Sequence, residues 1–381
     1  MAADGHEVTV LTGLPNYPDG VINPPYRGKI GYRETIDGVD VRRVWVFASP
    51  SKRARSRLIN QFSFMIMTAL RGTRLRRPDA ILVESHPLFV TLAAGWLRRL
   101  KRAHVVLNVS DLWPESAVAT GMLRAESLLV KVAARIERWA YNDAAHIIGM
   151  SQGIVDGIVA VFPEPLRVSL IKNGVDLNLF KPADPVARAG AREKLGLGTE
   201  AFVVAHIGNQ SLTYDFDLIL FAAAACPDIT FLFAGGGSQA AYIESQVTTH
   251  RLSNVRLLGT LPHDSMPLVW AAADVSLLAF HDHTVAGTTI PAKIYESFAT
   301  GTPLVAAIRG EGAALIEKAG AGVIVRVGDK QAFVHALHEM AASPQRLSEM
   351  GRAGRAYGEA TLSPDAVKAE YLAILESVAK P

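Results

Sequence analysis

The chain has 381 residues, of which 49% are hydrophobic and 20% charged, a balance typical of a globular protein long enough to bury two cores. The single cysteine, Cys226, excludes an internal disulfide and a cysteine-based metal cluster, and we interpret it as a small buried residue. Apolar runs stay short of the roughly 20 residues that cross a bilayer, and MAADGHEV lacks the features of a signal peptide, so we expect a cytoplasmic protein.

The net charge of +3 is distributed unevenly along the chain. Between Ser51 and Arg102, twelve basic residues stand against Asp79 and Glu84, so this segment carries +10 and the remainder −7. It encloses the apolar stretch QFSFMIMTALRG at 61–72, and two interpretations stay open: docking on an anionic membrane face, or a core helix under a solvated basic surface. Nucleic-acid binding is not supported, because no helix-turn-helix, zinc finger or basic-aromatic interleaving accompanies the charge.

Short β-branched runs alternate with helical patterns, which predicts an α/β fold with parallel sheets and helices on both faces. In the first half we expect strands within 6–12, 79–85, 103–110, 146–151 and 167–173. In the second half we expect them within 202–208, 229–237, 254–259, 275–280, 303–307 and 322–327.

These patterns predict a first domain at 1–172 and a second at 199–360, joined by a linker at 173–198 that is rich in turn residues. Residues 361–381 are expected to form an amphipathic helix, with Ser363 as its cap and Pro364 in its first turn.

The stretch from 291 to 322 predicts a socket for a nucleoside diphosphate. Pro291 and Gly301 suit the first turn and the left-handed end of a short helix, on which Lys293 and Glu296 share a face. A strand follows, and then a turn opens another helix, whose free N–H groups and dipole favour a phosphate. That turn consists of Arg309, Gly310, Glu311, Gly312 and Ala313. We expect Lys293 to bind phosphate oxygens and Glu296 to accept hydrogen bonds from ribose hydroxyls.

This segment resembles the donor site of the retaining GT-B glycosyltransferases of family 4, and more closely that of the bacterial O-antigen and capsule subgroup typified by fucosamine transferases. Further landmarks of the subgroup occur in order at 6–20, 111–123, 170–182 and 254–267. The resemblance implies two doubly wound Rossmann-like domains facing a cleft, with the final helix crossing back onto the first domain. It also implies a UDP-linked N-acetylated amino or deoxy sugar as donor, a polyprenyl-linked sugar acceptor on the inner membrane face, and neither cofactor nor metal.

The resemblance assigns the diphosphate to Lys293, the ribose to Glu296, and phosphate to the amides around Gly312. Gly208 and Asn209 follow a strand of the second domain, and the backbone near Leu258 and Gly259 is assigned to the base. Two departures from the family are Thr288, where many members have a glutamate, and NQSLTYDFD, where many have a basic pair. Lys293 would then carry more of the phosphate charge, or Arg309 would assist it.

In the first domain, strand ends bring His86, Asn108, Ser110 and Asp111 to the side where open α/β sheets bind ligands. We expect Asp111 to contact the sugar or the acceptor hydroxyl, with a helix cap before LWPES as the alternative. Transfer with retention of the anomeric configuration needs no strong enzymic base, because the leaving phosphate takes the proton of the acceptor hydroxyl. The protein instead stabilises the developing charge.

The family begins with a strand and a glycine-rich loop, whereas this chain starts inside the helix that follows them. We therefore expect the first domain to lack its first strand, and the native protein to carry roughly 15 to 30 further residues.

Three other patterns are interpreted without catalytic roles. Asp215 to Asp217 resembles a metal-binding D-x-D but opens a helix, which favours capping. His281, Asp282 and His283 are adjacent loop positions that do not converge easily on one ion. Gly235 to Gly237 lacks the acidic partner of a dinucleotide fingerprint, and a close approach of its backbone to the donor stays open.

Two other functions stay open for this chain: a UDP-sugar 2-epimerase, and a non-catalytic chain that binds UDP.

Overall fold

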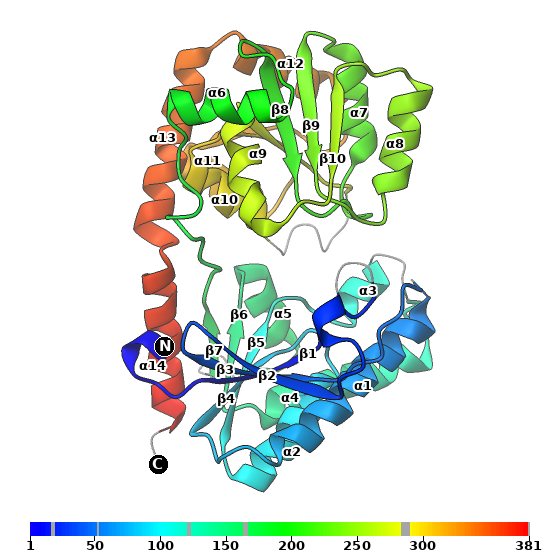
Figure 1. Ribbon diagram of the computed structural model, residues 1–381, viewed down its shortest axis with the longest axis vertical. Coiled ribbons are helices and arrows are strands. Elements are labelled where there is room, and N and C mark those ends of the chain that lie inside the picture. Colours follow the sequence, from blue (N-terminus) through cyan, green and yellow to red (C-terminus); the bar gives the residue numbers. More distant parts are fainter. Residues whose placement is uncertain (17–19, 52, 120–122, 163–166, 283–289, 380–381) are drawn as a thin grey trace. The chain divides into compact units, whose positions relative to one another are not determined.

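The computed structural model describes the chain except residues 17–19, 52, 120–122, 163–166, 283–289 and 380–381. Lys52, His283 and Thr288, which entered the sequence predictions, lie outside the described residues. The chain divides into two units, Met1–Ile171 with Lys368–Pro381, and Lys172–Val367. Both are α/β with parallel sheets, as predicted, and are described separately below (Figure 1).

The first unit contains two sheets. One has the order β1-β3-β2 and the other, which is parallel throughout, has the order β4-β5-β6-β7. Its strands are β1 Thr9–Gly13, β2 Gly31–Ile36, β3 Val39–Val44, β4 Ala80–Glu84, β5 His104–Val109, β6 His146–Gly149 and β7 Val168–Leu170. Its helices before the C-terminal segment are α1 Ala54–Gly72, α2 Val90–Lys101, α3 Glu115–Ala119, α4 Leu128–Asp143 and α5 Gln152–Val161.

The hairpin of β2 and β3 was not predicted. Its turn is Asp37 and Gly38, both with positive φ, and its strands pair antiparallel from Gly31↔Val44 to Ile36↔Val39. Asp-Gly between two β-branched runs is a strong hairpin signal, so the sequence did contain the information.

The described strands β1 and β4 have no hydrogen-bonded neighbour on one side, although helices join the two sheets: α1 packs on β1, α2 on β4, and α1 on α2. Val10 of β1 is 39% exposed and Leu82 of β4 is 43% exposed, whereas buried parallel strands are normally covered on both faces.

The second unit contains one parallel six-stranded sheet of order β10-β9-β8-β11-β12-β13. Its strands are β8 Phe202–Ile207, β9 Ile229–Ala234, β10 Val255–Gly259, β11 Val275–Ala279, β12 Leu304–Ala307 and β13 Gly322–Ile324. Its helices are α6 Pro185–Lys194, α7 Phe216–Ala225, α8 Ala240–Thr249, α9 Met266–Ala272, α10 Ala292–Thr300, α11 Glu311–Ala319, α12 Lys330–Ala341 and α13 Pro344–Thr361.

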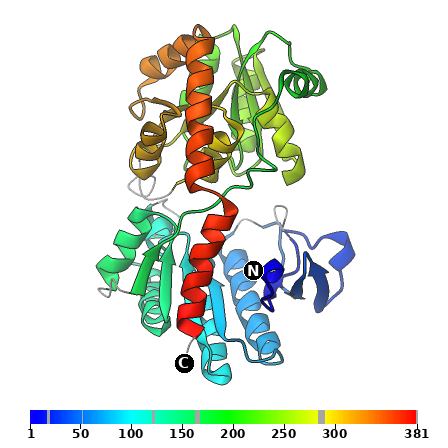
Figure 2. The same cartoon turned by 90° about the vertical axis from the view of Figure 1, so that its left-hand side faces the viewer.

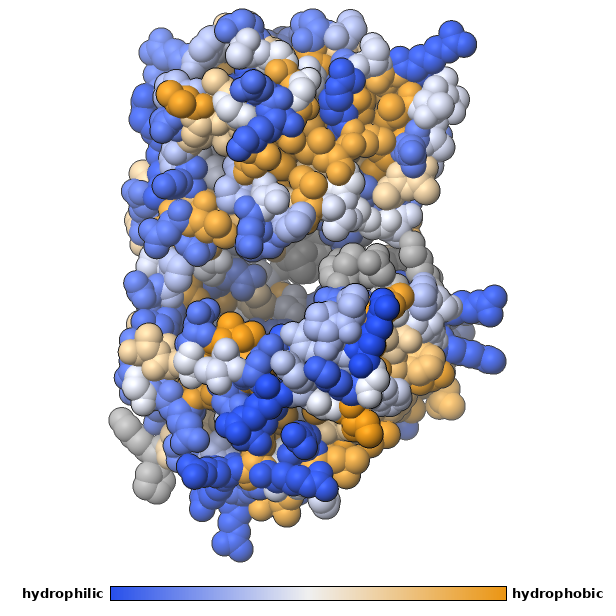
Figure 3. All heavy atoms as spheres, in the orientation of Figure 1, coloured by the Kyte–Doolittle hydropathy of each residue, from blue (hydrophilic) through white to orange (hydrophobic). Residues whose placement is uncertain are grey.

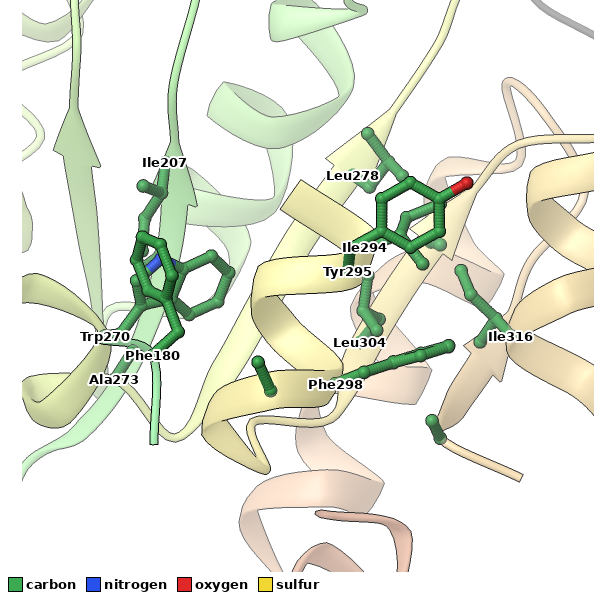
Figure 4. Close-up of a cluster of buried hydrophobic side chains, with 14 of the residues drawn as sticks. Phe180, Ile207, Trp270, Ala273, Leu278, Ile294, Tyr295, Phe298, Leu304 and Ile316 are labelled. Carbon is green, nitrogen blue, oxygen red and sulfur yellow. The ribbon is translucent and has the colours of Figure 1, made fainter. Parts of the chain in front are cut away.

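Two hydrophobic clusters cover the two faces of this sheet. One contains residues of α9, α10 and α11, and the other residues of α7, α8 and α12. Figure 4 shows the first, in which Ile294, Tyr295 and Phe298 of α10 pack around Leu278 and Leu304 of the neighbouring strands. Because two successive turns of α10 are anchored in this way, the helix has a fixed position against the sheet.

The stretch 173–198, predicted as a linker, contains α6 and contributes to the core of the second unit. Phe180 is 3% and Leu197 9% exposed within the first of the two clusters. The C-terminal helix α14, Pro364–Ala379, follows α13 in the chain (Figure 2). From Lys368 onward it belongs to the first unit, where the Tyr371 hydroxyl donates a hydrogen bond to Asn108 (2.8 Å) and Lys368 pairs with Asp4 (3.2 Å).

Candidate functional site

The helix α10 carries the two residues that the sequence singled out. Pro291 is its N-cap and not part of its first turn, while Gly301 ends it in the left-handed conformation as predicted (φ 66°). Lys293 and Glu296 lie three positions apart and yet have different surroundings. Lys293 is 6% exposed and turns toward β8, whereas Glu296 is half-buried and turns toward α9.

Lys293 is a buried ammonium without a carboxylate bound to it. Its Nζ lies 3.2 Å from Nε2 of His206 and 4.1 Å from the centre of the Tyr214 ring. Among the described residues it forms no ion pair, and burial lowers its pKa from 10.5 to about 7. Because a buried charge is costly unless it is paired, this lysine has the character of an anion-binding residue whose partner is a ligand.

Glu296 is held by the indole of Trp270, whose Nε1 donates a hydrogen bond of 3.0 Å to Oε2. Burial raises the pKa of this carboxyl, while the Trp270 hydrogen bond opposes that shift. The second carboxylate oxygen has no hydrogen bond among the described residues. An oriented carboxylate with an unoccupied oxygen is suited to accept hydrogen bonds from a pair of hydroxyl groups.

The N-terminus of α11 lies against that of α10. A Cβ on Gly312 would come within 3.3 Å of Ile294 and within 4.0 Å of Pro291, so glycine permits the two helices to begin side by side. Gly310, with φ 77° and ψ −149°, is the N-cap of α11. Ala313 is buried in the same core. The two helices therefore begin side by side, and the positive dipole ends at their N-termini favour an anion there.

Arg309 and Glu311 flank this helix start. Arg309 is 52% exposed and forms an ion pair of 2.5 Å with Asp282. Glu311 occupies the first turn of α11, where a negative charge is favourable. Burial, and secondly the charge of Glu311, raise the pKa of the neighbouring Tyr295. Arg309 thus has a carboxylate partner, whereas Lys293 forms no ion pair among the described residues.

The ends of β8, β9 and β10 approach one another closely through glycines. Gly208 follows β8 with φ 111°, and a Cβ there would lie 3.9 Å from Nζ of Lys293. A Cβ on Gly235 would overlap the Gly208 carbonyl, and one on Gly237 would lie 2.7 Å from Oδ1 of Asn209. The glycines after β9 therefore serve the contact between neighbouring strand ends, which the sequence alone did not predict.

The residues expected to meet a base lie at the end of β10. Leu258 is half-buried and packs against the core, and Gly259 has φ 67° with open space where a Cβ would stand. Its carbonyl accepts a hydrogen bond of 2.8 Å from the Gly235 amide. Gly208, Asn209, Leu258 and Gly259 thus lie at the carboxyl edge of the sheet, where ligands of open α/β sheets bind.

In the first unit, Asp111 follows β5 and accepts a hydrogen bond of 2.8 Å from Oγ of Ser116 in α3. Nearby, Glu84 at the end of β4 accepts hydrogen bonds from Asn108 (2.7 Å) and Ser110 (2.6 Å). The sequence analysis named Asn108, Ser110 and Asp111 but missed Glu84, which their polar side chains hold in place. The exposed His86 follows this group.

Three further residues were missed in the second unit, namely His206, Tyr214 and Trp270. A histidine inside the apolar strand FVVAHI was a visible signal, because a buried polar group needs a partner. Of the patterns set aside, Asp215 does cap α7, accepting from the Leu218 amide at 3.0 Å. No group of three metal-ligating side chains occurs among the described residues, and Cys226 is buried.

Two family models match the chain. Residues 1–174 match a glycosyl transferase 4-like domain, and residues 203–343 match the group 1 glycosyl transferases. Both models describe glycosyltransferase domains, and the chain has the GT-B fold. As expected for that fold, it resembles Anabaena Alr3699/HepE in complex with UDP, with a TM-score of 0.70, 19% identity, and coverage of 98% of this chain and 100% of the other. WaaG, a glycosyltransferase involved in lipopolysaccharide biosynthesis, matches with a TM-score of 0.66 and 14% identity over 95% of this chain and 98% of the other.

The matches to two curated relatives cover smaller shares of the two chains. The D-inositol 3-phosphate glycosyltransferase of Segniliparus rotundus is 30% identical over 226 residues, which are 56% of this chain but only 48% of the relative. WcaI of Escherichia coli K12, a glycosyl transferase whose name refers to colanic acid biosynthesis, is 21% identical over 79% of this chain and 75% of the relative.

Proposed function

We propose that the chain transfers a sugar, with retention of anomeric configuration, from a UDP-sugar to a lipid-linked acceptor in the synthesis of a surface polysaccharide. The observation that carries the proposal is the buried Lys293, to which no carboxylate of the described residues is bound and which lies on a helix whose N-terminus adjoins that of α11. A diphosphate supplies the negative charge that such a site lacks.

In this proposal the diphosphate binds Lys293 and the first amides of α11, around Gly312. The free oxygen of Glu296 accepts from the ribose, and the base lies by Leu258 and Gly259. As the bond from the anomeric carbon to the phosphate oxygen breaks, Lys293 and the helix amides stabilise the charge that grows on the leaving phosphate. That phosphate takes the proton of the acceptor hydroxyl, so no separate base is required. Asp111 binds the transferred sugar or the acceptor, and neither metal nor cofactor takes part.

The donor and acceptor classes rest on the chain's similarities. The solved Anabaena protein is a complex with UDP, and WcaI bears a name from polysaccharide biosynthesis, which together favour the O-antigen and capsule subgroup over other members. A Corynebacterium glutamicum mannosyltransferase that depends on GDP-mannose is also 30% identical over 219 residues, so GDP-sugars belong in any test of the donor. The N-acetylated amino or deoxy sugar is part of the proposal.

The proposed membrane docking rests on an apolar stripe along α1 and α2. Ile59, Phe62, Ile66 and Leu70 recur at helical spacing on α1 and are 40% to 53% exposed, and Trp96 of α2 is 55% exposed. Apolar side chains are visible among hydrophilic ones over these helices (Figure 3). No helix among the described residues has the length and apolarity of a membrane span. An exposed apolar stripe with arginines at both ends suits the interface of an anionic leaflet, and we propose the inner face of the plasma membrane.

A binding-and-release assay tests the function. Titration with UDP-GlcNAc, UDP-glucose and GDP-mannose identifies the donor, and release of free UDP is then measured with and without a polyprenyl diphosphate-linked sugar. Release that depends on the acceptor supports the transferase. Conversion of the sugar without UDP release would instead identify a 2-epimerase, and binding without turnover a non-catalytic UDP-binding protein. Lys293→Ala and Glu296→Ala are each expected to abolish turnover, and full activity in both would contradict the proposal.

A further inference from the structure

His206 is a fully buried histidine in the middle of an apolar core, in the strand β8. Its ring is enclosed by the rings of Tyr214 at 5.0 Å, Phe216 at 4.9 Å and Phe233 at 6.1 Å between centres. Packing on these sides fixes the imidazole in one orientation. No step of the proposed transfer uses this residue, and yet a polar ring in such a place needs a reason.

The hydrogen bond between His206 and Lys293 has a defined direction. While Lys293 is charged, its ammonium group only donates, so Nε2 of His206 accepts. The neutral imidazole then carries its proton on Nδ1, for which no hydrogen-bond partner occurs among the described residues. Burial, and secondly the nearby Lys293, lower the pKa of His206 well below its ordinary value, which keeps the ring neutral. The acceptor therefore remains available whenever Lys293 is charged.

The groups that face Lys293 are few. His206 faces it from β8, Tyr214 faces it from the segment before α7, and Glu296 is the nearest carboxylate on α10 itself. Glu296 is committed to Trp270 through one oxygen and forms no ion pair with Lys293. His206 is thus the one described side chain that accepts a hydrogen bond from the ammonium group.

We propose that His206 is a positioning residue for the donor, which aims the ammonium group of Lys293 at the diphosphate by accepting one of its protons. This inference rests on the proposed function. The lysine side chain has four rotatable bonds, and without a fixed acceptor it must give up its rotational freedom each time the donor binds, which lowers affinity. Gly208 completes the arrangement, because the missing side chain leaves the ammonium group open on that side.

The test is a double-mutant cycle on donor binding. Kd for UDP-glucose is measured by calorimetry for the wild type, His206→Phe, Lys293→Met and the double variant. UDP-glucose is preferable to UDP because its diphosphate does not titrate near neutral pH. Since a hydrogen bond to a charged group contributes about 1.5 to 3 kcal/mol, His206→Phe should weaken binding about tenfold or more when Lys293 is present, and by less than about twofold when it is methionine.

The conservative variant His206→Gln separates positioning from packing. Its amide oxygen restores an acceptor, so we expect affinity within about threefold of the wild type, although its smaller side chain packs less well against the aromatic rings. An equal loss of affinity for His206→Phe in both Lys293 backgrounds, or a Gln variant as weak as the Phe variant, would overturn the inference.

The pH dependence of stability without ligand gives a second readout, which does not depend on the donor. Loss of the acceptor should make the ammonium less favourable, so His206→Phe should shift the pH range over which Lys293 titrates to lower values. If the wild type binds no nucleotide-sugar at all, the proposed function fails while this shift still tests the contact. An unchanged titration range in His206→Phe would exclude the role assigned to His206.

Discussion

Replacement of Lys293 by methionine is expected to stabilise the protein while it weakens donor binding. Burial lowers the pKa of this lysine from 10.5 to about 7, because the folded protein disfavours its charged form. The unfolded chain therefore binds the proton more tightly, and folding is opposed most strongly below pH 7. The penalty to folding decreases between about pH 7 and 10.5, because Lys293 becomes neutral first in the folded and then in the unfolded protein. The shift corresponds to a penalty on the order of 5 kcal/mol at low pH.

The assay is urea unfolding of the ligand-free protein at pH 6, 8 and 10. At pH 6 Lys293→Met should exceed the wild type in free energy of unfolding by up to about 5 kcal/mol, and the difference should narrow toward zero at pH 10. The wild type should gain stability with rising pH, and the variant should lack this component. UDP at one fixed concentration should stabilise the wild type more than the variant, because only the wild type retains the cation proposed to bind the diphosphate.

Lys318→Met provides the matched control, since Lys318 lies exposed on α11 close to the site in sequence. It should change stability by less than about 0.5 kcal/mol at any of the three pH values. The reasoning is refuted if Lys293→Met is less stable than the wild type at pH 6. It is equally refuted if the two methionine variants behave alike.

Three further predictions concern the neighbours of this site and the first unit. Gly312→Val should destabilise the second unit by about 1 to 3 kcal/mol, because even a Cβ there would lie within 3.3 Å of Ile294. Calorimetric unfolding measures this loss of stability. Gly190→Val is the control, because a Cβ at Gly190 on α6 would meet open space. Trp270→Phe should raise the Kd for UDP about tenfold, because Glu296 loses the hydrogen bond that orients it toward the ribose. The affinity for inorganic diphosphate, which has no ribose, should change little. An equal effect on both ligands would contradict the role assigned to Glu296. The double variant Ile66→Asp, Leu70→Asp should sediment with phosphatidylglycerol vesicles at least fivefold less than the wild type. Val186→Asp, which changes an 81% exposed residue of α6, should sediment like the wild type. Undiminished sedimentation of the double variant would exclude α1 as the docking face.

The sequence by itself determined the local features of this protein. Alternating strands and helices, the left-handed end of α10 at Gly301 and the Asp215 cap of α7 follow from interactions within a few residues, and the structure contains each of them. The hairpin at Asp37 and Gly38 belongs to the same class and was overlooked. Local rules suffice there because propensity and capping depend on neighbours one to four positions away.

Only the tertiary structure decided the surroundings of the site. Lys293 and Glu296 share a face by spacing, and yet one meets His206, 87 positions earlier, and the other Trp270, 26 positions earlier. The stretch predicted as a linker became part of a core for the same reason, since Phe180 and Leu197 found apolar partners elsewhere in the chain. Burial, and with it the pKa of a buried lysine, depends on which distant strands and helices pack together, and helical spacing contains no information about them.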